Sequence, residues 1–276
     1  MSPYRGSADL TREWPHFDFS IDTGVATLVL DRPEVLNALT FDVYADLRDL
    51  LGELPQRDDV RVLLLTGRGR GFCSGGDVNA IIGQLQEMDA PGRLDFTRMT
   101  GEVVRRMRAC PLPIIAAVNG VAAGAGAVIG LAADLRVLAR SASFSFLFTK
   151  VGLAGADMGS AYLLPRLVGL GRATELLLLG DALDSQRALD LGLAYRVVED
   201  EELPRTAAEL ARTLAHGPAL AYQTTKLLLA RELDMDLAGS LELEAVTQAL
   251  MMSSRDHAEF YEAFRSRRPP RWTGRK

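Results

Sequence analysis

The sequence predicts an α/β fold with a helical C-terminal region. Short apolar runs typical of buried strands alternate with longer stretches in which apolar residues recur every three or four positions, as in amphipathic helices. Two glycine-rich loops, residues 71–77 and 119–126, each follow one of the apolar runs. From residue 203 to residue 269 the pattern is helical throughout. Alternating strands and helices give the α/β class, although the residues themselves show no fixed-period repeat.

The elements expected up to the second glycine-rich loop follow from apolar runs and helix signals. Strands are expected at residues 25–30, 62–66 and 114–118. Helices are expected at residues 40–54, 78–88 and 96–108. Thr40 is the predicted N-cap of the first helix, because its hydroxyl can accept a hydrogen bond from the first turn. Pro111 and Pro113 end the third helix.

The second half of the chain continues the alternation before becoming helical. Strands are expected at residues 135–139, 144–148 and 195–198, and helices at 125–133, 160–167, 172–179 and 185–191. The alternate phenylalanines Phe144, Phe146 and Phe148 suit a buried strand, with an apolar acyl pocket as the alternative interpretation.

The composition excludes several classes of partner. The chain has 276 residues, is 48% apolar and carries a net charge of −5, which disfavours nucleic acid as a partner. No apolar stretch reaches the roughly 20 uninterrupted residues of a membrane span, so no membrane partner is expected. Two cysteines cannot form a disulfide framework and fit a cytoplasmic protein. Cys73 is expected to be a small apolar filler.

The two glycine-rich loops indicate backbone chemistry. Small residues leave N–H groups uncovered, and two such loops that converge supply paired amide donors to a carbonyl oxygen, an oxyanion hole. Two unrelated tight turns are the alternative. A dinucleotide fold is excluded because five residues separate Val118 from Gly124 and no acidic residue follows at the ribose position. A P-loop, a serine hydrolase and a metal site are excluded because their motifs and ligand spacings are missing.

Several ordered motifs resemble the crotonase (enoyl-CoA hydratase/isomerase) superfamily. They are Asp31-Arg-Pro-Glu-Val-Leu-Asn-Ala-Leu39, Gly71-Phe-Cys-Ser-Gly-Gly-Asp77 and Pro113-Ile-Ile-Ala-Ala-Val-Asn-Gly-Val-Ala-Ala-Gly-Ala-Gly126. Later segments beginning at Leu164, Gly180 and Asp256 also match. The resemblance spans about residues 20 to 270.

The resemblance implies a crotonase-type spiral of ββα units in residues 1–200, carrying an acyl-CoA site, and a helical trimerisation region in residues 201–276. It implies a homotrimer or a dimer of trimers, and coenzyme A as part of the substrate rather than as a separate cofactor. Gly76 and Ala125 would supply the oxyanion amides. The acyl-CoA groove would be lined by Val35, Leu36, Ala38, Ser74, Gly75, Asp77, Val78 and Phe148. Arg32 and Lys226 are expected at solvent or at a CoA phosphate.

The chain departs from the family pattern at the two positions where hydratases carry glutamates. Val128 occupies the first position and Phe148 the second. Addition of water across a double bond needs a base and an acid, and apolar side chains are neither. Ordinary hydratase chemistry would therefore need another polar group.

Asp157 is the candidate acid/base, in the otherwise small and apolar loop that precedes the helix at residue 160. Its position resembles that of the family's dehalogenase nucleophile counted from Pro165, and lies one place beyond an isomerase acid counted from Gly152. Burial among apolar neighbours would raise its pKa. The alternative is a carboxylate at the N-terminus of the following helix.

We expect an acyl-CoA enzyme that stabilises a thioester enolate and performs enoyl-CoA isomerase or hydratase chemistry, with Asp157 as its single acid/base. Thioester hydrolysis or dehalogenation with Asp157 as nucleophile is one alternative. A catalytically silent acyl-CoA-binding protein is another. Tyr162 is a second polar candidate, for which packing on the following helix is the favoured interpretation.

Overall fold

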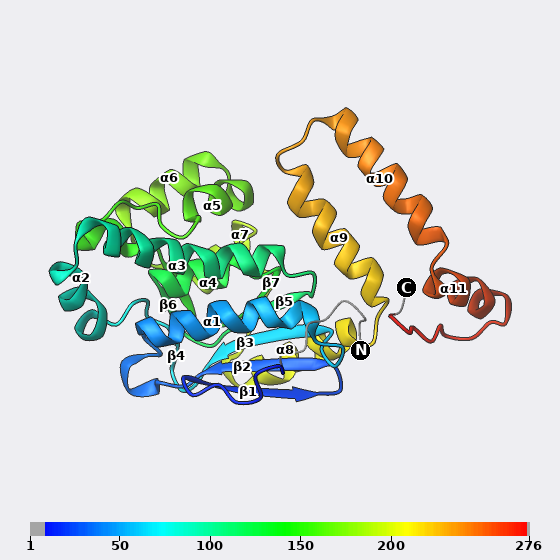
Figure 1. Ribbon diagram of the computed structural model, residues 1–276, viewed down its shortest axis with the longest axis horizontal. Coiled ribbons are helices and arrows are strands. Elements are labelled where there is room, and N and C mark those ends of the chain that lie inside the picture. Colours follow the sequence, from blue (N-terminus) through cyan, green and yellow to red (C-terminus); the bar gives the residue numbers. More distant parts are fainter. Residues whose placement is uncertain (1–8, 275–276) are drawn as a thin grey trace.

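The computed structural model describes residues 9–274, which form two β-sheets surrounded by helices (Figure 1). The larger sheet has the strand order β1-β2-β3-β5-β7-β10. Its strands are Phe17–Asp22, Val25–Leu30, Val62–Gly67, Ile114–Val118, Leu135–Ala139 and Arg196–Val198. Only β1 and β2 pair antiparallel; the remaining neighbours are parallel.

The smaller sheet has the order β4-β6-β8-β9, made of Gly71–Cys73, Val121–Ala123, Ser143–Ser145 and Leu183–Asp184. The first three strands are parallel, and β9 is antiparallel to β8.

The chain repeats the same order of elements as it passes between the two sheets. A strand of the large sheet (β3, β5, β7) is followed by a strand of the small sheet (β4, β6, β8) and then by helix. This is the ββα spiral that the family resemblance implies. The helical part of each turn differs greatly in length, because residues 78–109 fill one turn and residues 125–132 fill the next. The structural repeat therefore leaves no fixed period in the sequence.

Most expected elements are confirmed, and the helices keep close to their predicted bounds. The helices of the spiral are α1 Phe41–Glu53, α2 Gly83–Glu87, α3 Ala90–Ala109, α4 Ala125–Ala132, α5 Ser160–Val168, α6 Leu170–Leu179 and α7 Ser185–Asp190. Thr40 caps α1 by accepting a hydrogen bond from the Val43 amide at 3.4 Å. A π-helical turn, Val78–Ile82, precedes α2.

Three sequence expectations need correction. The strand expected at residues 144–148 is only Ser143–Ser145, and a 3₁₀-helix, Leu147–Val151, follows it. The helix expected at 96–108 begins six residues earlier, because Asp89 caps it by accepting from the Gly92 amide. The strands β4 and β6 lie inside the two glycine-rich loops, where three-residue runs give no periodic signal.

The C-terminal helices are α8 Leu203–Ala215, α9 Ala219–Glu232, α10 Leu237–Met252 and α11 Arg255–Arg265. Helix α8 packs on β2, β3, β5 and β7 of the large sheet. In contrast, α9 and α10 form a hairpin that stands away from the rest of the chain (Figure 1). Helix α10 has no buried residue. No helix within residues 9–274 is long and apolar enough to cross a membrane.

A buried ion pair fastens α9 to the spiral. The Lys226 side chain is 8% exposed, and its Nζ lies 2.7 Å from Oδ2 of Asp134. The ammonium also donates to the carbonyls of Met107 at 3.1 Å and Leu112 at 2.9 Å. Asp134 in turn accepts from the Ile114 amide at 2.8 Å. Lys226 is therefore an internal anchor, and the expectation that it meets solvent or a CoA phosphate is wrong.

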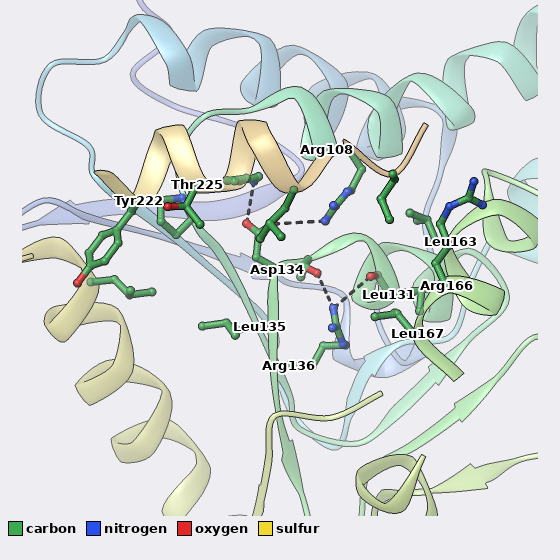
Figure 2. A pocket seen from close by; sticks show the side chains of 16 residues that line it. Arg108, Leu131, Asp134, Leu135, Arg136, Leu163, Arg166, Leu167, Tyr222 and Thr225 are labelled. Atoms are coloured by element: carbon green, nitrogen blue, oxygen red, sulfur yellow. Dashed lines mark hydrogen bonds and ion pairs between the residues drawn. The ribbon is translucent and has the colours of Figure 1, made fainter. Parts of the chain in front are cut away.

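The junction between α9 and the spiral is otherwise loosely filled. A hollow of about 380 Å³ lies there, and its lining combines leucines of α4, β7, α5, α8 and the α9 region with the charged residues Arg108, Asp134, Arg136, Arg166 and Lys226. Figure 2 shows Arg108 and Asp134 facing one another at this hollow, and their closest side-chain atoms are 3.3 Å apart. The ion pair and hydrogen bonds of Lys226, rather than close apolar packing, hold α9 against the spiral.

Replacement of Lys226 by methionine should therefore loosen the C-terminal hairpin. Loss of one partner from a buried ion pair costs on the order of 3 kcal/mol, measured as the free energy of unfolding in urea. Limited proteolysis should then cut between α8 and α9 in the variant.

The matched control is Lys150→Met, which removes the exposed pair between Lys150 and Asp181, whose side chains are 50% and 69% exposed. Exposed pairs contribute about 1 kcal/mol or less. Equal destabilisation by the two substitutions would contradict the anchoring role of Lys226.

Candidate functional site

The two glycine-rich loops converge because their strands are neighbours in the small sheet. Strand β4 pairs with β6 in parallel, with Gly71 opposite Val121 and Cys73 opposite Ala122. Parallel neighbours end at the same edge of a sheet, so the segments that leave β4 and β6 emerge side by side. A Cβ placed on Gly75 would lie 3.5 Å from the Ala125 nitrogen. The convergence expected from the sequence is confirmed.

Two backbone N–H groups are free at this edge. Within the described residues, neither the Gly76 amide nor the Ala125 amide donates a hydrogen bond. The neighbouring groups are occupied, because Asp77 donates to the Leu39 carbonyl at 2.8 Å and Gly124 donates to that of Ser145 at 2.8 Å. A pair of uncommitted donors on adjoining loops has the character of an oxyanion hole.

Helix α4 adds a favourable field to one of these donors. Ala125 is its first residue, so its amide has no partner inside the helix and lies at the positive end of the helix dipole. Gly124 adopts φ 51° and ψ −122°, a backbone conformation that glycine alone takes readily. At the other end, buried Arg136 donates to the carbonyls of Leu131, at 3.1 Å, and Ala133.

A second glycine is required for the two loops to approach this closely. A Cβ on Gly126 would lie 2.1 Å from the Cys73 carbonyl oxygen, a distance at which backbone must move. The Cys73 side chain is completely buried, and burial raises the pKa of its thiol to about 12. The expectation that Cys73 is an apolar filler rather than a nucleophile is confirmed.

Residues 35–39, which precede α1, are joined to the first glycine-rich loop by hydrogen bonds. The Leu39 amide donates to the Gly75 carbonyl at 2.8 Å, and the Ser74 amide donates to that of Leu36 at 2.9 Å. The Ser74 hydroxyl donates to the Val35 carbonyl at 3.0 Å. Most residues predicted for the acyl-CoA groove therefore lie side by side, in residues 35–38 and 74–78, and these two segments are called the ridge. Val35 and Val78 have exposed side chains on it.

Asp77 shapes this ridge through its side chain. Its carboxylate accepts from the amides of Asn79, at 3.0 Å, and Ala80, at 3.1 Å, and from the Arg32 guanidinium at 2.9 Å. The Ala80 amide and Arg32 hold the pKa of Asp77 below its usual value, against a smaller opposing effect of burial. Arg32 also donates to the Ala38 carbonyl at 2.6 Å, so both side chains brace the loop.

Apolar side chains occupy the two positions where glutamates would assist hydration. Val128 is fully buried in α4. Phe148 is 7% exposed, and its Cε1 lies 4.0 Å from the Cβ position of Gly124, next to the free Ala125 amide. Phe144 and Phe146 are completely buried, as expected for core residues. The edge of the proposed oxyanion hole is thus apolar and uncharged at Val128 and Phe148.

Asp157 precedes α5 without capping it. Gly159 is the N-cap and provides no side-chain hydrogen bond, so the Asp157 side chain does not cap the helix; its interpretation as a carboxylate near the helix N-terminus stays a prediction. Its carboxylate instead accepts from the Met158 amide at 2.8 Å, and Met158 has φ 50°, unusual for a residue with a side chain. Burial raises the pKa of Asp157, only partly offset by the Met158 amide. A carboxyl with a raised pKa is suited to exchanging protons.

Tyr44 of helix α1 lies beside one of the two free amides, although no sequence motif singles it out. Its side chain is 3% exposed, and its hydroxyl lies 3.9 Å from the Cβ position of Gly76. Burial raises the pKa of Tyr44, and the charges of Cys73 and Asp157 contribute smaller increases. The phenol therefore lies within electrostatic reach of Asp157 and next to an oxyanion donor. Helical periodicity gave no signal for this, because it marks the face and not the end of a side chain.

A largely apolar pocket of about 480 Å³, which Arg105 and Arg108 also border, is lined by the two residues that follow Asp157 in the chain. Its lining includes Met158, Gly159, Val104 of α3 and Leu233 beyond α9. Tyr162 also borders it, but its hydroxyl donates to Asp234 at 2.7 Å. Tyr162 is therefore satisfied elsewhere, as its packing interpretation implied. Residues 9–274 hold no cluster of three or more His, Cys, Asp or Glu side chains able to bind a metal ion.

Comparisons with known proteins agree with this geometry. Residues 20–275 match the family model described as enoyl-CoA hydratase/isomerase. The 1,2-epoxyphenylacetyl-CoA isomerase of Escherichia coli K12 is 40% identical over 260 residues, covering 92% of this chain and 97% of the relative. A provisionally assigned enoyl-CoA hydratase of Rhodobacter capsulatus is 37% identical, covering 93% and 97%. A provisionally assigned enoyl-CoA hydratase of Streptomyces coelicolor A3(2) has a crystal structure with TM-score 0.97, 59% identity and full coverage of both chains.

Replacement of Gly126 by alanine should separate the two loops. The added methyl group meets the Cys73 backbone, which cannot rotate away, and we expect a loss of about 3 kcal/mol or more in the free energy of unfolding. Gly171→Ala is the control, because a Cβ at Gly171 in α6 meets nothing within 4 Å. That variant should be as stable as the parent or slightly more so. Thermal unfolding of both variants checks this, and a fully stable Gly126→Ala protein would contradict the close approach.

Proposed function

Because the chain belongs to the enoyl-CoA hydratase/isomerase family, we propose that it moves a double bond along an acyl-CoA chain with Asp157 as its single acid/base. The observation that carries the proposal is the combination of two free amides on adjoining loops with one carboxyl, Asp157, whose pKa is raised by burial and whose charge acts on Tyr44 beside Gly76. The apolar Val128 and Phe148 support one proton-handling acid rather than two.

The thioester oxygen is placed between the amides of Gly76 and Ala125. Removal of a proton next to the thioester moves negative charge onto that oxygen, and donors that are already oriented stabilise it without reorganisation. The positive end of α4 acts on the same atom. Loss of one such donor typically costs about 3 kcal/mol of transition-state stabilisation.

Asp157 is assigned the proton transfer. Its carboxylate removes a proton from C2 of a 3-enoyl thioester, which gives a dienolate held at the oxyanion hole. The same carboxyl then returns the proton at C4, so the double bond lies between C2 and C3 and no water is consumed. One group suffices because each proton that it accepts is given back.

The groove and the pocket support an acyl-CoA ligand. The ridge formed by residues 35–38 and 74–78 offers exposed apolar side chains and backbone groups to the coenzyme A portion, which enters as part of the substrate. The pocket of about 480 Å³ beyond Met158 offers an apolar wall to the acyl chain. The E. coli relative, itself named as an isomerase, favours isomerisation over hydration.

Asp157→Asn should abolish isomerisation while preserving binding. We expect wild-type protein in D₂O to convert a 3-enoyl-CoA to the 2-enoyl product with deuterium incorporation, followed by mass spectrometry. The variant should show at least a hundredfold lower rate, the low end of typical general acid–base effects of about 10²–10⁴. Asp181→Asn, which alters an exposed carboxylate paired with Lys150, is the control and should retain the wild-type rate.

The pH dependence supplies an independent readout in the same assay. Proton removal requires the carboxylate form, and a raised pKa delays ionisation to higher pH. The rate should therefore fall as the pH drops through a value above the ordinary range of aspartate. Hydration of crotonyl-CoA that survives in Asp157→Asn would sink the proposed role, and release of free coenzyme A together with the carboxylic acid would point to hydrolysis.

We further propose a homotrimer or a dimer of trimers, supported by the unpartnered C-terminal hairpin. Large apolar side chains are exposed along it; Leu229, Leu237, Leu241 and Leu250 are each at least 55% exposed. Helix α10 buries none of its residues within its own chain. Apolar surface of this extent is stabilised by contact with another copy.

Light scattering should therefore give three or six times the mass of one chain. Leu241→Glu, together with Leu250→Glu, should shift the protein to monomer by placing charge in the contact. Leu178→Glu on α6, where Leu178 is 64% exposed, is the control for general loss of solubility. A wild-type monomer would contradict the assembly.

A further inference from the structure

One polar group at the site remains without a role in the isomerisation: the hydroxyl of Tyr44. The ring is held on α1 and packs edge-on against Phe96, with the ring centres 5.9 Å apart. Ile81 and Tyr44 lie on the same side of Gly76, with the Ile81 Cδ1 at 3.5 Å and the Tyr44 hydroxyl at 3.9 Å from its Cβ position. The phenol oxygen thus lies next to Gly76, which carries one of the two free amides.

The hydroxyl has no protein partner. Among the described residues it takes part in no hydrogen bond, although the side chain is only 3% exposed. Its oxygen is also absent from the fully enclosed unpartnered atoms, which are Trp14 Nε1, Arg57 Nε and Glu232 Oε1. The oxygen therefore retains accessible surface, and a buried polar group that keeps such an opening is suited to a ligand.

Two candidate partners of the Tyr44 hydroxyl are excluded, the Asp157 carboxylate by geometry and the thioester oxygen by its number of lone pairs. Asp157 lies within electrostatic reach of Tyr44 but forms no hydrogen bond with it. A thioester oxygen has two lone pairs, and the amides of Gly76 and Ala125 already account for both. Among the atoms of a bound acyl-CoA, the partner left for the phenol is an oxygen on the acyl chain close to the thioester, which would replace water there.

We propose that the Tyr44 hydroxyl is a substrate-positioning group that donates a hydrogen bond to an oxygen atom on the acyl chain, at C2 or C3. The inference rests on the proposed acyl-CoA function and adds the substrate class, an oxygen-bearing acyl-CoA. Burial keeps the phenol protonated, so it acts as a donor at neutral pH. A plain alkyl chain in the same place would displace water from the hydroxyl and leave it unpartnered.

Binding of three matched ligands to the wild-type protein tests this directly. Butyryl-CoA, 2-hydroxybutyryl-CoA and 3-hydroxybutyryl-CoA differ only in the added oxygen, and their dissociation constants are measured by calorimetry. One of the hydroxy ligands should bind about three- to tenfold more tightly than butyryl-CoA, the range that one net hydrogen bond gives.

Tyr44→Phe removes only the hydroxyl and should bring that ratio close to one, while butyryl-CoA binds at least as tightly as before. The variant should unfold at the same temperature as the parent or higher, because it loses an unpartnered group. Tyr162→Phe, whose hydroxyl bonds Asp234, is the control and should keep the wild-type ratio.

The outcomes separate this proposal from the function on which it rests. An unchanged ratio in Tyr44→Phe, with all three thioesters binding, would overturn the role of Tyr44 and leave the acyl-CoA function intact. Equal binding of all three ligands by wild-type protein would do the same. Failure of every thioester to bind would overturn both.

Discussion

The parallel pairing of β4 with β6 is the interaction on which the site depends. It joins segments almost fifty residues apart, with Cys73 opposite Ala122, and delivers their free amides to one edge of the small sheet. The pairing tolerates no side chain at Gly126, because the Cys73 carbonyl fills that space. The convergence of the two free amides is therefore a consequence of strand register and not of the loops' own flexibility.

Helix α4 links this edge to the rest of the molecule. Its first amide belongs to the site, all eight of its residues are buried, and its last carbonyls receive the Arg136 guanidinium. The aspartate two residues beyond the helix, Asp134, holds Lys226 of α9. One short helix thus orients a donor at one end and, at the other, adjoins the polar anchor of the C-terminal hairpin.

The side chains around the two free amides limit the reactions that this arrangement can support. Val128 and Phe148 present hydrocarbon where a hydration mechanism needs carboxylates, which is why the proposed function assigns the proton transfer to Asp157 alone. The positive φ of Met158 turns the chain just after that aspartate, and burial raises its pKa.

The sequence by itself determined the class of fold and the order of most strands and helices. It also indicated a site built from backbone N–H groups. Apolar periodicity and glycine clusters are local signals, so runs such as residues 62–66 and 114–118 were predictable, and so were the motif positions Gly76 and Ala125. Tertiary structure alone decided which side chains meet. Three features bring together residues that are distant along the chain. They are the buried contact of Lys226 with Asp134, the ββα repeat that has no sequence period, and the position of the Tyr44 hydroxyl beside Gly76. Such contacts depend on register and packing across elements, which no local pattern encodes.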